Sequence, residues 1–171
     1  SATKAGPDII RDNGGEPVST RVGHSFIKAK MAETNAVFGG EHSAHYYFRD
    51  FWRADSGMLA AMHVLAALGQ QDKPLSEMMA KYNRYAASGE INSRLDSAEA
   101  QADRTEAVVK AFADRAENVD RLDGVTVELK DGNWFTVRAS NTEPLLRLNV
   151  EADTQEAVDA LVKEILAIIR A

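Results

Sequence analysis

The spacing of apolar residues divides the first half of the chain into alternating helices and strands. Phe26, Ile27 and Met31 recur at the spacing of one helix face, whereas short apolar runs between glycines and prolines are typical of strands. The pattern predicts a helix end at residues 7–13, strands at 17–22, 36–38 and 46–51, and helices at 25–34, 56–68 and 75–85. This alternation predicts a partial α/β domain at residues 1–86.

The second half has a different order of elements, and Ala-Ala-Ser-Gly at residues 86–89 has the composition of a linker before it. The pattern predicts strands at 91–95, 125–129, 134–137 and 145–150, a helix at 104–118 and a final helix. Asp153 and Glu156 form a capping-box-like start for the final helix. Its apolar stripe comprises Val158, Leu161, Val162, Ile165 and Ile169. Two helices on one antiparallel sheet predict an α+β domain at residues 87–171.

Composition restricts the classes of function. The chain has 171 residues, of which 44% are hydrophobic, so it can form one domain or two small ones. Its net charge of −6 argues against nucleic acid as a partner, because that binding requires a basic face. It has no cysteine, which excludes disulfides and thiolate chemistry. No apolar run is long enough to span a bilayer and no signal-peptide pattern is present, so we expect a cytoplasmic protein without a membrane partner.

The polar loop at residues 138–144, Arg-Ala-Ser-Asn-Thr-Glu-Pro, lies between two predicted strands. Ser140, Asn141 and Thr142 bring short side-chain donors into one turn, and Arg138 offers a planar cation suited to two parallel bonds with an oxyanion. The loop therefore predicts a phosphate site. The alternative is a hairpin in which these polar residues serve only the turn.

A second polar loop follows the glycine pair at residues 39–40. Within five residues it presents Glu41, His42, Ser43 and His45, and the glycines let the backbone turn tightly. A carboxylate accepts bonds from two neighbouring sugar hydroxyls, whereas the serine and histidine side chains donate or accept. These residues predict a sugar site. A metal site using Glu41, His42 and His45 is the alternative, although no second cluster of histidine or cysteine supplies further ligands.

Together the two loops resemble the α-D-phosphohexomutase family, in its bacterial phosphomannomutase/phosphoglucomutase branch. That family has a Gly-Glu-x-Ser-(Gly/Ala)-His loop in its third domain and an Arg-x-Ser-Asn-Thr-x-Pro loop in its fourth, and residues 40–45 and 138–144 match them in order. Similar stretches occur at residues 21–25, 55–57 and 148–152. Asn141 is more similar to the manno/gluco enzymes than to the phosphoglucosamine branch. The resemblance covers nearly the whole chain.

The resemblance implies roles for individual residues. Glu41, Ser43 and His45 would bind the sugar, and Arg138, Ser140, Asn141 and Thr142 would bind its phosphate. His24 corresponds to a family histidine proposed to assist proton transfer; from the residues alone it is a helix-entry position. The roles of two further charged residues are not decided by the sequence. Arg147 is either structural or part of the anion site, and we expect Glu143 to pair with a cation away from the phosphate.

Two family motifs do not occur in this sequence. These are the Ser-His-Asn loop that carries the phosphoserine and the Asp-Gly-Asp-x-Asp loop that binds Mg²⁺. The resemblance therefore implies a carboxy-terminal part of a longer enzyme, with most of the third domain and the fourth. That enzyme would interconvert mannose or glucose 6-phosphate and 1-phosphate through a bisphosphorylated intermediate, with Mg²⁺ and amino-terminal domains supplied elsewhere. We expect this chain alone to be inactive. The alternatives are a stand-alone phosphosugar-binding module and an interaction module that uses the aromatic run at residues 46–52.

Overall fold

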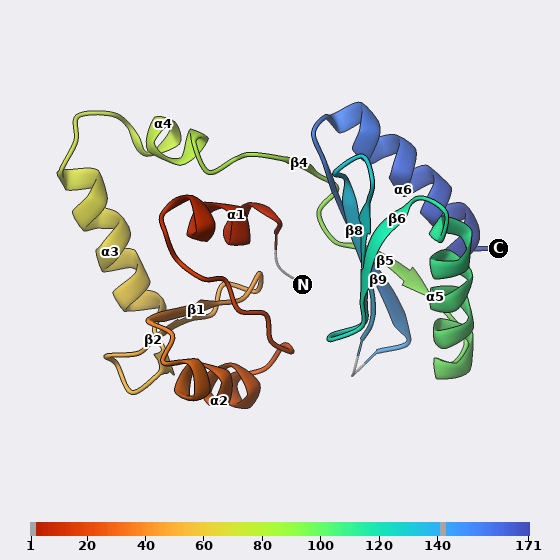
Figure 1. Cartoon of the computed structure of the whole chain (residues 1–171), viewed down its shortest axis with the longest axis horizontal. Coiled ribbons are helices and arrows are strands. Elements are labelled where there is room, and N and C mark those ends of the chain that lie inside the picture. The colour runs from red at the N-terminus through yellow and green to blue at the C-terminus, as the bar shows by residue number, and fades with distance from the viewer. Residues whose placement is uncertain (1–2, 141–142) are drawn as a thin grey trace. The chain divides into compact units, whose positions relative to one another are not determined.

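The computed structural model describes residues 3–140 and 143–171 (Figure 1). The chain forms two compact units, Ser1–Arg84 and Tyr85–Ala171, and each is described by itself. Within the described part of the chain, no helix has both the length and the apolar character needed to cross a membrane.

Unit 1 contains four helices and a small antiparallel sheet in the order β1-β2-β3. Its elements are α1 (Ala5–Asp12), α2 (His24–Thr34), β1 (Phe38–Gly40), β2 (Tyr46–Phe48), β3 (Ala54–Asp55), α3 (Gly57–Gly69) and α4 (Leu75–Ala80). Helix α2 packs on the sheet through Ile27 and Met31, which form one buried cluster with Tyr47. A Cβ atom at Gly39 would lie 3.1 Å from both Ile27 and Met31, so this position favours glycine because the helix approaches the strand closely.

Helix α3 contrasts with α2, because none of its described residues is buried. Met58 is 75% exposed and Leu65 is 64% exposed. A groove of about 890 Å³ is lined by this helix and by the sheet residues Phe38, Tyr46 and Phe48. The apolar spacing therefore predicted the helix correctly, but this helix leaves much of its apolar surface open.

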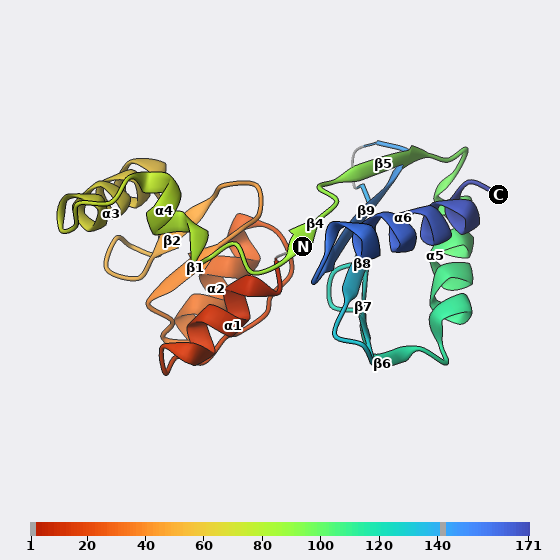
Figure 2. The ribbon, with the colours of Figure 1, turned by 90° about the horizontal axis from the view of Figure 1, so that it is seen from above.

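Unit 2 is a six-stranded antiparallel sheet with two helices (Figure 2). Its elements are β4 (Ala86–Ala87), β5 (Ile91–Arg94), α5 (Ala98–Phe112), β6 (Ala116–Asp120), β7 (Val125–Leu129), β8 (Trp134–Ala139), β9 (Leu145–Ala152) and α6 (Gln155–Ile169). The strand order is β4-β9-β8-β7-β6, and β5 also pairs with β9. Both helices cover the same face of the sheet, as Figure 1 shows.

The core of unit 2 lies between this sheet face and the two helices. Alternate residues of β8 and β9 are buried there, including Phe135, Val137, Leu146 and Leu148. Val158, Leu161, Ile165 and Ile169 of α6 are also buried, which confirms most of the predicted stripe, and Val162 packs against the same core. Because side chains alternate with a period of two, Arg147, Asn149 and Glu151 of β9 lie on the opposite sheet face.

Several predicted elements differ from those of the structure. Residues 17–22 form no strand, because no described strand pairs with them. The predicted linker contains β4, which pairs with β9. The predicted helix at 104–118 begins earlier, after the cap Ser97, and its end is replaced by β6, which pairs with β7. Thr154, not Asp153, caps α6, since its hydroxyl accepts a bond from the Ala157 amide.

Candidate functional site

The loop between β1 and β2 is a closed hairpin. The Glu41 amide donates to the His45 carbonyl at 2.9 Å, and the Ala44 amide donates to the Glu41 carbonyl at 3.1 Å. Ala44 has a φ of 65°, an uncommon value for a residue with a side chain. These bonds fix the backbone from which Glu41, Ser43 and His45 project.

Glu41 is held by Tyr47, which sequence reasoning missed as a site residue. The Tyr47 hydroxyl donates to Glu41 Oε1 at 2.6 Å, and the tyrosine is fully buried. Burial and then the bond to Glu41 raise the pKa of the Tyr47 hydroxyl, so it remains a donor at neutral pH. Among the described residues, Glu41 Oε2 has no hydrogen-bond partner, so it can accept from a ligand hydroxyl.

His45 is held by Asp55, the second residue that sequence reasoning missed in this role. Asp55 Oδ2 lies 2.7 Å from His45 Nδ1, and Asp55 Oδ1 accepts from the Tyr46 amide at 2.8 Å. The hydrogen bond with Asp55 raises the pKa of the His45 imidazole, and the same bond lowers the pKa of the Asp55 carboxyl. The pair therefore favours a protonated histidine beside an ionised aspartate.

His24 joins this group from the first turn of α2. Its ring centroid lies 4.8 Å from that of His45 and 5.3 Å from that of Tyr47, both in edge-to-face arrangements. The structure thus brings His24 and His45 together. His42 and Ser43 are exposed, and the structure records no side-chain hydrogen bond for either of them within the described ranges.

A metal set of Glu41, His42 and His45 does not form. In the described part of the chain, the group with metal-ligand character is His24, His45 and Asp55, whose ligand atoms lie within 4.8 Å of one another. Two imidazoles with one carboxylate do not fit Mg²⁺, which prefers oxygen ligands. The 2.7 Å contact between His45 and Asp55 is moreover a direct hydrogen bond.

In unit 2, the predicted phosphate loop connects β8 and β9. The strand register places Arg138 directly opposite Arg147. Val137 beside Arg138 and Leu148 beside Arg147 are buried in the core, so both arginines lie on the sheet face opposite the helices. Two like charges that face each other destabilise a sheet, and an anion between them removes this cost.

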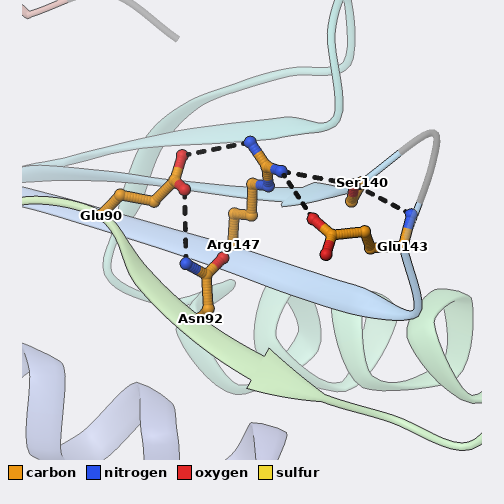
Figure 3. A network of polar contacts seen from close by, with 5 residues as sticks. All are labelled: Glu90, Asn92, Ser140, Glu143 and Arg147. Atoms are coloured by element: carbon orange, nitrogen blue, oxygen red, sulfur yellow. Dashed lines mark hydrogen bonds and ion pairs between the residues drawn. The ribbon is translucent and has the colours of Figure 1, made fainter.

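Arg147 contacts polar residues from two segments, the β8–β9 loop and the residue before β5 (Figure 3). Its Nη2 donates to Ser140 Oγ at 3.4 Å and lies 3.7 Å from Glu143, and its Nη1 lies 3.6 Å from Glu90. Glu143 pairs with a cation, as expected, but that cation is Arg147, which lies opposite Arg138 and not away from the predicted anion site. Arg147 Nε is buried without a partner among the described residues. Long ion-pair distances and an unpaired donor mean that the guanidinium is not saturated by its neighbours.

Arg138 has no ion pair within residues 3–140 and 143–171. Its backbone is packed against Gly124, where a Cβ atom would lie 2.7 Å from the Val137 carbonyl oxygen and 3.0 Å from Arg138 Cα. Gly124 also has a φ of 74°, so this turn requires glycine. Asn141 and Thr142, which the sequence assigns to the same anion site, lie outside the described residues.

Comparisons with known proteins identify the family of both units. Residues 1–85 match the profile "Phosphoglucomutase/phosphomannomutase, alpha/beta/alpha domain III", and residues 90–168 match "Phosphoglucomutase/phosphomannomutase, C-terminal domain". The chain is 43% identical over 146 residues to "Phosphohexose mutases" of Xanthomonas campestris pv. campestris, covering 84% of this chain and 32% of that protein. It is 40% identical over 167 residues to "Phosphomannomutase" of Methanocaldococcus jannaschii, covering 98% and 36%.

A solved structure shows the same fold. The phosphoglucomutase/phosphomannomutase family protein of Burkholderia thailandensis matches with a TM-score of 0.79 and 27% identity, over 99% of this chain and 36% of that chain. The chain thus spans about a third of the length of the relatives it matches. The family resemblance and the mixed helix-and-strand fold class expected from the sequence are confirmed.

Proposed function

The chain belongs to the phosphoglucomutase/phosphomannomutase family, and from this premise we propose that it supplies the sugar-binding and phosphate-binding loops of a hexose phosphate mutase. The reaction is the interconversion of a hexose 6-phosphate and a hexose 1-phosphate, with mannose or glucose as the sugar, through a bisphosphorylated intermediate. Unit 1 reads the sugar hydroxyls and unit 2 binds the phosphate.

One observation carries the proposal. Arg138 and Arg147 are direct cross-strand partners on the sheet face opposite α5 and α6, beside Ser140. A phosphate between them accepts charge-assisted hydrogen bonds from two planar guanidinium groups, a geometry that lysine does not reproduce. The hairpin-only interpretation of this loop does not account for two opposed arginines.

The other loop suits a neutral polyol. Glu41 is fixed by Tyr47 at one oxygen and offers the other, so it can accept from a sugar hydroxyl without first being ordered. His45 and the exposed Ser43 complete the donors and acceptors of the hairpin. His24 lies against His45 and is the candidate for assisting proton transfer to the reacting oxygen.

The division of labour follows from these side chains. The residues of this chain hold and orient the two ends of the phosphosugar, and the phosphoserine and Mg²⁺ chemistry of the family belongs to other domains. The 171-residue chain by itself is therefore expected to show no mutase turnover. Measurable conversion of mannose 1-phosphate by the purified chain would place the transferring group within these residues.

The test compares two ligands. Glu41→Gln in the 171-residue chain should weaken binding of mannose 1-phosphate at least tenfold and leave inorganic phosphate binding unchanged, because only the sugar reaches that loop. Isothermal titration calorimetry measures both affinities. Glu33→Gln is the matched control, since Glu33 pairs with Lys30 on the exposed side of α2. Equal losses for both ligands in Glu41→Gln would contradict the assignment of the sugar to unit 1.

A further inference from the structure

We propose that Asp55 is a positioning residue that holds the His45 imidazole with its Nδ1–H toward the carboxylate, so that Nε2 is the ring atom presented to a sugar hydroxyl. The inference rests on the proposed function of the hairpin that contains Glu41 and His45. Asp55 lies in β3, ten positions after His45 in the chain.

Both oxygens of Asp55 are already engaged. Oδ2 lies 2.7 Å from His45 Nδ1, and Oδ1 accepts from the Tyr46 amide at 2.8 Å. The strand register supports this arrangement, because Tyr47 pairs with Asp55 and the Ser56 amide donates to the Tyr46 carbonyl. The carboxylate is therefore fixed by the sheet before any ligand arrives.

An ionised carboxylate can only accept hydrogen bonds, so the proton of this bond belongs to His45 Nδ1. In the neutral imidazole the other nitrogen, Nε2, then carries a lone pair, and in the protonated imidazole it carries a second N–H. The side chain can thus accept from a hydroxyl in one state and donate in the other without turning its ring. The groups that face this histidine are His24 from α2, Glu41 from the hairpin and Asp55 from β3.

Stability alone does not explain the pair. The His45 side chain is 41% exposed and that of Asp55 is 25% exposed, and ion pairs at such positions contribute little to folding. Tyr47 and Glu41 are arranged in the same way, because the Tyr47 hydroxyl fixes one oxygen of the Glu41 carboxylate. In both cases a residue of the small sheet orients a hairpin side chain whose other polar atom remains available.

The experiment determines the tautomer of His45 by long-range ¹H–¹⁵N NMR on the 171-residue chain, at a pH where the ring is neutral. The wild-type chain should show the Nδ1–H form. In Asp55→Asn, the amide oxygen should keep the bond from the Tyr46 amide, and the NH₂ group then points at His45 Nδ1. The substitution should therefore reverse the tautomer to Nε2–H.

Asp50→Asn is the matched control, because Asp50 is exposed and pairs only with the adjacent Arg49 among the described residues. It removes the same charge and should leave the tautomer unchanged. Asp55→Asn should also weaken mannose 1-phosphate binding about tenfold without changing inorganic phosphate binding.

The possible results distinguish a failure of the positioning role of Asp55 from a failure of the proposed function. A wild-type chain in the Nε2–H form, an unchanged tautomer in Asp55→Asn, or a reversed tautomer with unchanged phosphosugar affinity would each overturn the positioning role. If the wild-type chain binds no phosphosugar, the proposed function of the loop fails, and the tautomer measurement still reports whether Asp55 fixes the ring.

Discussion

The two candidate loops connect antiparallel strands, but they hold their side chains in different ways. In the unit 1 hairpin, Glu41 and His45 are fixed by neighbours at 2.6 and 2.7 Å. In the unit 2 loop, the contacts of Arg147 are 3.4 to 3.7 Å long, and Arg138 has no ion pair among the described residues. Hydroxyl recognition depends on direction, whereas phosphate recognition depends first on charge. The difference between the loops therefore matches the difference between the two ends of a phosphosugar.

The hydrophobic cores beneath the two loops differ in the opposite direction. Fifteen described hydrophobic residues are buried in one cluster in unit 2, and three are buried in the cluster of unit 1. Arg138 and Arg147, which have few or long contacts, therefore lie on the unit with the larger hydrophobic core. The hairpin with Glu41 and His45 lies on the smaller cluster, where local hydrogen bonds hold the side chains in place of extensive packing.

The largest expected effect tests this contrast in packing. Phe112 is fully buried and contacts Phe135 with ring centroids 4.9 Å apart, so Phe112→Ala should lower the free energy of unfolding of unit 2 by about 3–5 kcal/mol. Leu65→Ala in α3, at a position 64% exposed, should change stability by less than about 0.5 kcal/mol. Urea denaturation followed through unit-specific amide signals measures both. Equal losses of stability in the two variants would contradict the difference in burial between Phe112 and Leu65.

The next effect tests charge recognition in unit 2. Arg138→Ala should weaken inorganic phosphate binding tenfold or more, because a charge-assisted hydrogen bond contributes about 1.5–3 kcal/mol. Arg138→Lys should recover only part of the affinity, since lysine lacks the planar pair of donors. Arg121→Ala serves as the control, because Arg121 is paired with Glu106. An unchanged phosphate affinity in Arg138→Ala, measured by calorimetry, would remove the anion role from this loop.

A smaller effect of opposite sign is expected at Glu143. Its carboxylate competes with phosphate for Arg147, so Glu143→Gln should strengthen phosphate binding by about two- to fivefold, the range of an exposed ion pair. The gain should shrink as salt screens the charges. Glu117→Gln on exposed β6 is the matched control. Weaker binding in Glu143→Gln would mean that Glu143 orders Arg147 for the ligand instead of competing with it.

The smallest effect is the pH dependence of unit 1. Because bonding to Asp55 raises the His45 pKa, the contribution of His45 to stability is full below its ordinary value of 6.5 and is lost as the pH rises through the raised value. The pKa of Asp55 is lowered, so its contribution is full above 3.8 and is lost as the pH falls through the lowered value. The urea midpoint for unfolding of unit 1, followed through its amide signals, should therefore be highest between pH 3.8 and pH 6.5. In Asp55→Asn that maximum should flatten, and a pronounced maximum that persists there would contradict the role of the pair.

Elements with strong local signals were predictable. The stripe of α6 and the strands on either side of the 138–144 loop follow from periodicity, and both candidate loops carry the family motifs. Elements that depend on distant partners were not predictable. The strand β6 exists because it pairs with β7, and residues 17–22 stay irregular because no described strand pairs with them.

The same distinction applies to the site. The loop residues Glu41, His45 and Arg138 stand out in the sequence, but the residues that orient them do not. Asp55 reaches His45 only through the pairing of β2 and β3, and the face of Arg147 was settled only by its register with Arg138. Alternation alone could not assign that face, because a shift of one residue exchanges the two faces of a strand.

The most direct test of the account is a chemical-shift titration of the ¹⁵N-labelled chain. With mannose 1-phosphate, amide signals at residues 40–45 and at residues 138–147 should both move, with an affinity of roughly millimolar strength because the ligand contacts few groups in each unit. With inorganic phosphate, only the signals at residues 138–147 should move. Mannose 1-phosphate shifts that occur at neither loop, or phosphate shifts centred on residues 40–45, would contradict the assignment of sugar and phosphate to the two units.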